Sequence, residues 1–128
     1  MIILLDTSTS ICRLTLIEGD NRSDETWQAD RNLASGLLQY LNEQLQTRGK
    51  SWTDIEAIGV FEGPGSFTGL RIGLTVMNTI ADARAIPIVG SQGSCWQQDA
   101  VARIKRGENS QIVLPRYGSE VHITKPRK

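Results

Sequence analysis

A glycine-rich segment constrains the fold of this sequence more than any other feature. Residues 63–73 read GPGSFTGLRIG, and they stand between an apolar run at 57–61 and an amphipathic stretch at 70–85. Glycines at such a junction let the backbone turn sharply and let another group approach it closely. The segment therefore predicts a strand, a tight turn and a helix in succession, which is the local unit of α/β folds.

The remaining patterns extend this unit to a whole domain. Short apolar or alternating runs predict strands at 2–5, 12–17, 23–28, 57–61 and 86–89, and the 3.6-residue period predicts helices at 32–48, 70–85 and 94–106. Three strands followed by alternating helices and strands indicate a mixed five-stranded sheet with helices packed on it. Residues 112–114 form either a last strand or a contact that holds the tail to the body. We expect one domain over 1–115 and a basic tail over 116–128.

Composition excludes several classes of protein. The 14 basic and 14 acidic residues give no net charge, which argues against a general nucleic-acid binder. Two cysteines are too few for a disulfide framework, and one histidine cannot supply a paired-histidine zinc site. No apolar stretch is long enough to span a membrane, and no secretory signal is seen, so we expect a cytoplasmic protein. The basic tail is interpreted as a solvated terminus, with a contact to RNA phosphates as the alternative.

Two polar segments are candidates for binding an anion. Glycines and free N–H groups at the start of a helix favour phosphates, and the polar turn after the first strand adds a carboxylate and hydroxyls. The segment nevertheless lacks the lysine of a Walker A loop, and Thr68 occupies the place of the last glycine of GxGxxG. A tight structural turn capped by Ser66 or Thr68 is thus the favoured interpretation. The candidate anion-binding residues are Asp6, Thr7, Gly63, Gly65, Ser66, Thr68 and Gly69.

The sequence provides no catalytic pair. Ser66 has no neighbouring base, His122 lies in the tail, and the GxSxG pattern would need a glycine at 68. We therefore assign no catalytic residue and no metal ligand.

The helix at 70–85 has more apolar surface than a one-sided helix needs. Leu70, Leu74 and Met77 form one stripe, and Ile72, Val76 and Ile80 form a second, so the apolar arc covers about 200°. One stripe can face the sheet, and the other faces either the neighbouring helix or another protein. We favour a protein–protein interface made by both of the first two helices. The predicted interface residues are Leu33, Leu37, Leu41, Leu70, Leu74, Met77 and Ala81.

Residues 58–73, IGVFEGPGSFTGLRIG, together with ILLDTST at 3–9, closely resemble the signature of the TsaB (YeaZ) family. The resemblance extends over about residues 1–100 and implies the actin-like/Hsp70-like ATPase (ASKHA, ribonuclease H-like) half-domain. The chain resembles a short form that lacks most of the second half found in the family. It also has Asn32 where the family often has histidine.

The resemblance further implies a function and partners. The family acts in threonylcarbamoyl (t6A) modification of the adenosine next to the anticodon in tRNAs that read ANN codons. Its members are non-catalytic scaffolds that bind a TsaD-like transferase, and a TsaE-like ATPase joins the complex. Carried over to this chain, pairing uses the helices at 32–48 and 68–85, and a homodimer uses much the same surface. The tRNA is contacted indirectly, and no membrane is involved.

The resemblance also implies where cofactors belong. ATP and metal are expected on the partner proteins, and no cofactor on this chain alone, because the missing half would be one wall of a nucleotide cleft. The alternative is a nucleotide-binding or phosphotransfer protein of the ASKHA class that uses Asp6, Thr7, Ser66 and Thr68. A peptidase is disfavoured by the missing metal site and nucleophile–base pair. The interface hypothesis predicts that Leu74→Glu abolishes partner binding and leaves the helical content nearly unchanged.

Overall fold

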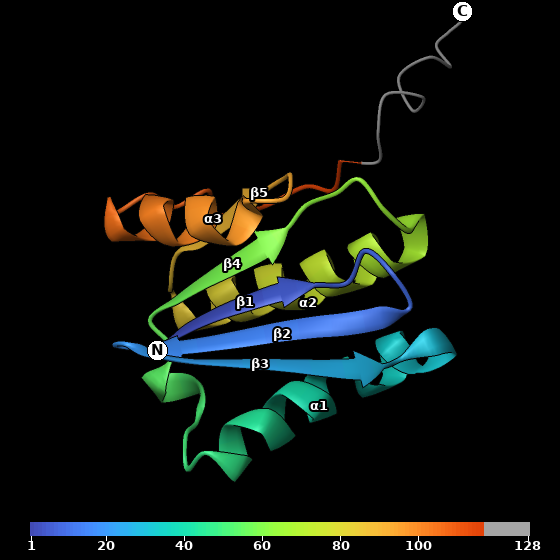
Figure 1. The fold of residues 1–128 in the computed structure, drawn as a ribbon, viewed down its shortest axis with the longest axis horizontal. Helices are drawn as coiled ribbons and strands as arrows, with labels where there is room; N and C mark the ends of the chain where they lie inside the picture. Colours follow the sequence, from blue (N-terminus) through green and yellow to red (C-terminus); the bar gives the residue numbers. More distant parts are fainter. Residues whose placement is uncertain (117–128) are drawn as a thin grey trace, which may run out of the picture.

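A computed structural model describes residues 1–116 and shows one mixed five-stranded sheet (Figure 1). The strands lie in the order β3-β2-β1-β4-β5. β1 is antiparallel to β2 and parallel to β4, β2 is antiparallel to β3, and β4 is parallel to β5. The predicted element order and mixed sheet are therefore confirmed. The elements are β1 (Ile2–Asp6), β2 (Ile11–Glu18), β3 (Asn21–Gln28), α1 (Leu33–Thr47), β4 (Ala57–Phe61), α2 (Phe67–Arg84), β5 (Ile88–Ser91) and α3 (Trp96–Lys105), with 3₁₀ turns at Asp30–Asn32 and Trp52–Asp54.

The larger core lies between the sheet and the helices α1 and α2. In α1, leucines recur every four residues from Leu33 to Leu45, so they form one stripe that is buried on the sheet. Alternate residues of the strands, such as Ile3, Leu14 and Ile58, complete this core from the other side. Burial of these side chains is what holds both helices in place.

The opposite face of the sheet carries α3 over β4 and β5 (Figure 1). Gly59 of β4 allows this helix to come close, because a Cβ there would lie 2.6 Å from Leu4 Cδ2 and 3.1 Å from Ala100 Cβ. Gln97 at the start of α3 reaches β2 and donates a hydrogen bond to Thr15 Oγ1 (3.2 Å). Asp24 accepts from the same hydroxyl (2.6 Å), so polar contacts tie α3 to the antiparallel strands.

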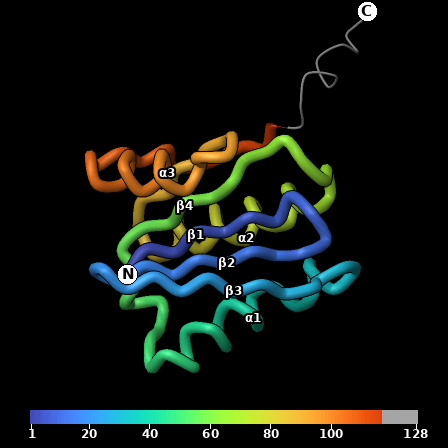
Figure 2. Tube along the Cα trace, viewed as in Figure 1, coloured from blue at the N-terminus to red at the C-terminus, as the bar shows by residue number. Residues whose placement is uncertain are grey.

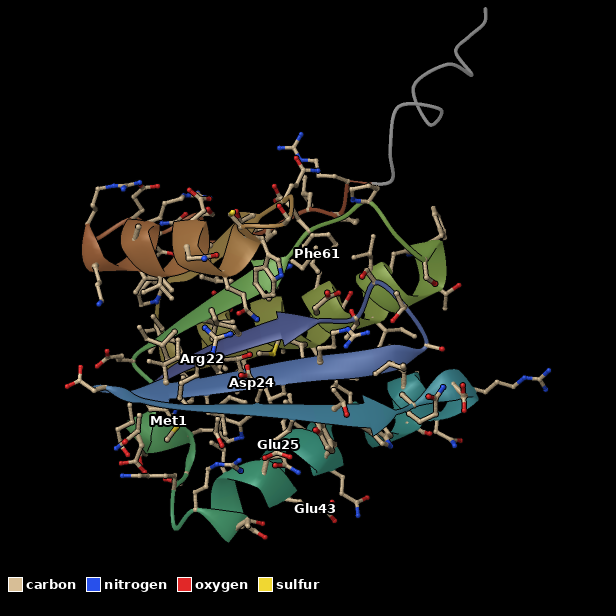
Figure 3. All side chains as sticks on the ribbon, viewed as in Figure 1. Met1, Arg22, Asp24, Glu25, Glu43 and Phe61 are labelled. Atoms are coloured by element: carbon tan, nitrogen blue, oxygen red, sulfur yellow. The ribbon has the colours of Figure 1, made fainter. Side chains whose placement is uncertain are left out.

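Successive residues of β3 lie on opposite sides of the sheet, as Figure 3 shows for Asp24 and Glu25. Asp24 also accepts hydrogen bonds from Arg22 on the α3 side, and the hydrogen bond from Thr15, followed by those from Arg22, lowers its pKa. Glu25 faces α1 and forms a salt bridge with Arg48 at 3.0 Å. Arg22 also donates a hydrogen bond to Gln97 of α3, so the strand has polar contacts with both helix layers.

Several predicted boundaries differ from the structure by one to three residues, and two of these differences have a clear local reason. α2 begins at Phe67 rather than 70, because Ser66 caps it by accepting the Gly69 N–H at 3.2 Å. β5 begins at Ile88 rather than 86, since proline has no N–H for the sheet ladder; the Pro87 carbonyl still accepts a hydrogen bond from Ile58 N.

Residues 109–116 pack against the body instead of forming a strand, the second of the two predicted alternatives. This segment, here called the strap, returns from the end of α3 past the outer edge of β5 (Figure 2). Ser110 N donates to the Ile88 carbonyl, and Val113 is buried in the larger core. The side chain of Asn78 on α2 both donates to the Val113 carbonyl and accepts from its N–H, each at 2.9 Å. The strap therefore covers an edge that would otherwise be open to strand pairing. The rest of the predicted tail lies outside the described residues.

Candidate functional site: a groove between α1 and α2

The glycine-rich turn packs directly on the polar turn that follows β1. Thr7 Oγ1 donates a hydrogen bond to the Gly69 carbonyl at 2.7 Å, and Ser66 N donates to the Ser8 carbonyl at 2.8 Å. Asp6 closes its own turn by accepting the Ser8 N–H at 2.8 Å. The two candidate anion-binding segments are thus brought together, and they bind each other.

This contact explains why the segment needs glycine. A Cβ on Gly65 would collide with Ser8, and a Cβ on Gly69 or Gly73 would collide with Thr7. Gly63 has a φ of +128°, and a Cβ there would meet the Arg116 carbonyl of the strap. The close approach that the glycines permit is therefore used by the chain itself.

The favoured interpretation of a structural turn accounts for most of the candidate anion-binding residues. Asp6, Thr7, Gly63 and Gly65 have intramolecular partners or neighbours that explain them. Ser66 and Gly69 also have such partners, but together with Thr68 they line an open cavity beside the start of α2. Anion binding there stays a prediction.

The seven predicted interface residues lie inside the chain. Leu33, Leu37, Leu41, Leu70, Leu74, Met77 and Ala81 expose between 0% and 6% of their surface. They form the stripes that hold α1 and α2 to the sheet, so they cannot contact a partner while the core is intact. The helices were correctly expected to have surplus apolar surface, but the stripe that was predicted to contact a partner is the one buried in the fold.

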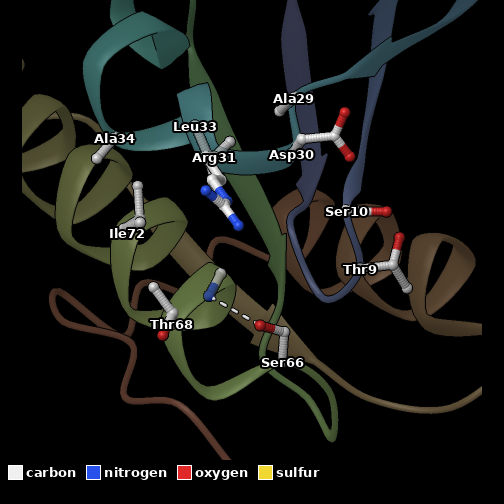
Figure 4. A pocket seen from close by; sticks show the side chains of 11 residues that line it. Thr9, Ser10, Ala29, Asp30, Arg31, Leu33, Ala34, Ser66, Thr68 and Ile72 are labelled. Atoms are coloured by element: carbon white, nitrogen blue, oxygen red, sulfur yellow. Dashed lines mark hydrogen bonds between the residues drawn. The ribbon is translucent and has the colours of Figure 1, made fainter.

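The second stripe of α2 lies along a groove between the two helices. Ile72 and Val76 are half-buried, and with Ala34 of α1 they form its apolar floor. The groove consists of two adjoining cavities of about 490 and 460 Å³, which share Ala34, Thr68 and Ile72. Figure 4 shows the first cavity, between the 3₁₀ turn before α1 and the first turn of α2.

Beside this groove lie an exposed leucine and two arginines, and one of the arginines packs on an exposed phenylalanine. Leu38, one turn beyond Ala34, is 50% exposed, and Phe67 at the start of α2 is 55% exposed. The Arg71 guanidinium lies 5.2 Å from the centre of the Phe67 ring. Arg31 extends its guanidinium into the first cavity toward α2 (Figure 4). Sequence analysis assigned no role to these four residues. The large apolar side chains of Leu38 and Phe67, close in sequence to the predicted interface residues, were the only signal that it could have used.

Other titratable groups lie outside the groove. Burial raises the pKa of Glu62, at the end of β4, against the opposing effect of Arg116 and Arg103. Burial, with a smaller effect of Asp6, raises the pKa of Cys12 to about 12. Within residues 1–116, no three His, Cys, Asp or Glu side chains are grouped closely enough to hold a metal ion. No helix of that part of the chain is long and apolar enough to cross a membrane.

The chain is similar to proteins that act in the threonylcarbamoyl modification of tRNA. The family model of TsaD, the tRNA N6-adenosine threonylcarbamoyltransferase, matches residues 27–92, about half of the chain. The chain is 30% identical over 110 residues to the tRNA threonylcarbamoyladenosine biosynthesis protein TsaB of Escherichia coli, covering 80% of this chain and 47% of that protein. It is 24% identical over 123 residues to the TsaB of Haemophilus influenzae, covering 96% and 52%.

The structural comparison agrees. YeaZ from Pseudomonas aeruginosa superposes with a TM-score of 0.69 and 28% identity, over 83% of this chain and 49% of that one. The chain spans about half the length of these relatives. The fold is therefore an actin-like half-domain, as predicted from the sequence.

Proposed function

The chain belongs to the TsaB (YeaZ) family, and from this premise we propose that it is a scaffold subunit in the synthesis of threonylcarbamoyladenosine in tRNA. It docks on a TsaD-like transferase through the groove between α1 and α2 and supports modification of tRNAs that read ANN codons. A TsaE-like ATPase joins through the complex. The chain itself supplies no catalytic group, and ATP and metal belong to its partners.

One observation supports this proposal: the second stripe of α2, called the outward stripe from here on, is partly open to solvent. Ile72 and Val76 form an apolar floor that α1 covers only in part, and exposed Leu38 lies one turn beyond Ala34 of the same groove. Exposed apolar surface of this kind, next to polar groups, is typical of protein–protein contacts. Because the groove runs between α1 and α2, a pair of helices from the partner could pack against both and bury the stripe.

The experiment is light scattering after size-exclusion chromatography, on this chain alone and mixed with the TsaD-like protein of the same organism. A complex of the summed mass supports the proposal, and adding this chain should then increase tRNA modification by the transferase. A homodimer that ignores the transferase would contradict it. Saturable binding of Mg-ATP to the chain alone, weakened by Asp6→Asn, would favour the nucleotide-binding alternative instead.

A further inference from the structure

The charges around the groove are not balanced. Within residues 1–116, neither Arg31 nor Arg71 takes part in a salt bridge, whereas Arg22, Arg48 and Arg103 each pair with a carboxylate. Among the described residues, Asp30 is the only acidic one that lines the groove. Its carboxylate accepts a hydrogen bond from Gln28 at 2.8 Å and points away from Arg31 (Figure 4).

Each arginine is placed for a contact across the groove. Arg71 is held over the Phe67 ring, one turn before it on α2, which limits the conformations of its side chain. Arg31 reaches toward the first turn of α2, where the N-terminal end of the helix adds a partial positive charge. The two cavities that these arginines line share Thr68, so both charges belong to one continuous rim.

We infer that the transferase presents a carboxylate-bearing segment to this rim, while its apolar side chains cover Ile72 and Val76. The inference rests on the proposed function and adds the chemistry of the partner to it. Two guanidinium groups beside an apolar floor fit a helix that has one apolar stripe flanked by Asp or Glu. An apolar partner without carboxylates would instead desolvate both arginines without compensation, which is unfavourable.

The test measures the affinity and association rate of the transferase for four variants by calorimetry and stopped-flow fluorescence. Arg31→Glu and Arg71→Glu should each weaken binding at least tenfold, mainly through slower association. Arg84→Glu is the matched control, because Arg84 is exposed in the last turn of α2, outside the groove. It should change the affinity less than twofold. Val76→Glu places a charge on the floor and tests docking itself.

The outcomes separate the inference from the proposed function. If Val76→Glu abolishes binding but both groove arginine variants bind like the wild type, docking stands and the carboxylate inference is wrong. If all four variants bind like the wild type, the partner does not use this groove and both fail. Binding to Arg71→Glu that is restored when one exposed carboxylate of the transferase is changed to lysine would support the inference most strongly.

Discussion

The two apolar stripes of α2 differ in what covers them. The stripe of Leu70, Leu74 and Met77 is buried on the sheet, whereas Ile72 and Val76 line a groove that α1 covers only in part. The two stripes look alike in the sequence, and the interface was predicted on the first of them. The difference teaches that a wide apolar arc in a sequence does not tell which side of the helix the sheet covers, and that the fold decides which side stays partly open.

The largest expected difference is in stability. Leu74→Ala should lower the free energy of unfolding by about 2–5 kcal/mol, because it leaves a cavity between α2 and the sheet. Val76→Ala, in the half-open stripe, should cost about 1 kcal/mol or less. Urea unfolding followed by circular dichroism measures both, and equal losses would contradict the assignment of the stripes. Leu74→Glu buries a charge, so we now expect it to unfold the chain instead of leaving its helices unchanged.

The packing of α2 also depends on the close contact between Gly73 and Thr7, which lies in the turn after β1. In an open helix Gly73→Ala would stabilise by about 1 kcal/mol, but here the new Cβ collides with Thr7. We expect a net loss of about 1–3 kcal/mol. A double-mutant cycle with Thr7→Ala should show that most of the loss disappears when the threonine is gone. Additive effects would mean that Gly73 matters for a reason other than this contact.

The contact of α2 with the strap should have an effect of similar size. Asn78→Ala removes two hydrogen bonds to Val113 and should cost about 1–3 kcal/mol. Thr79→Ala is the control, because its hydroxyl bonds only to the Thr75 carbonyl on the exposed side of α2. Hydrogen exchange of residues 109–116 should rise in the first variant and not in the second. Unchanged exchange in Asn78→Ala would show that the strap is held by burial of Val113 alone.

Thiol reactivity gives the mildest probe of the inner core. Cys12 is buried beneath the helices with a pKa raised to about 12, whereas Cys95 is exposed. At pH 8 one thiol of the native chain should react quickly with a disulfide reagent, and the second only in denaturant. The reaction of Cys12 should become faster in Leu74→Ala and not in Val76→Ala. Two fast thiols in the wild type would contradict the burial of Cys12.

Much of the architecture could be predicted because its signals are local. The alternating strands, the leucine period of α1 and the serine cap of α2 each depend on neighbours in sequence. The meeting of Thr7 with Gly69 joins residues 62 positions apart, and no local pattern contains it. The glycine-rich turn was therefore recognised as a close approach, but its occupant was found only in the structure.

The groove was predictable only in part. Helical periodicity gives the angle between Leu74 and Val76, but it does not say which of the two faces the sheet. The packing of α2 on β4, β1 and β5 decides this, and these strands come together only in the folded chain. Nothing in the sequence singles out Arg31 and Arg71, because most arginines of a folded protein are exposed. Their place beside a cavity is visible only in the structure.

We expect the outward stripe, Ile72 and Val76, to contact the partner, whereas Leu70, Leu74 and Met77 hold α2 in the fold. The most direct measurement is the affinity of Val76→Glu for the TsaD-like transferase, taken together with its unfolding curve. We predict that binding is lost while the urea midpoint stays within a few tenths of a molar of the wild type. Wild-type affinity with an unchanged midpoint would show that the groove is not the docking surface.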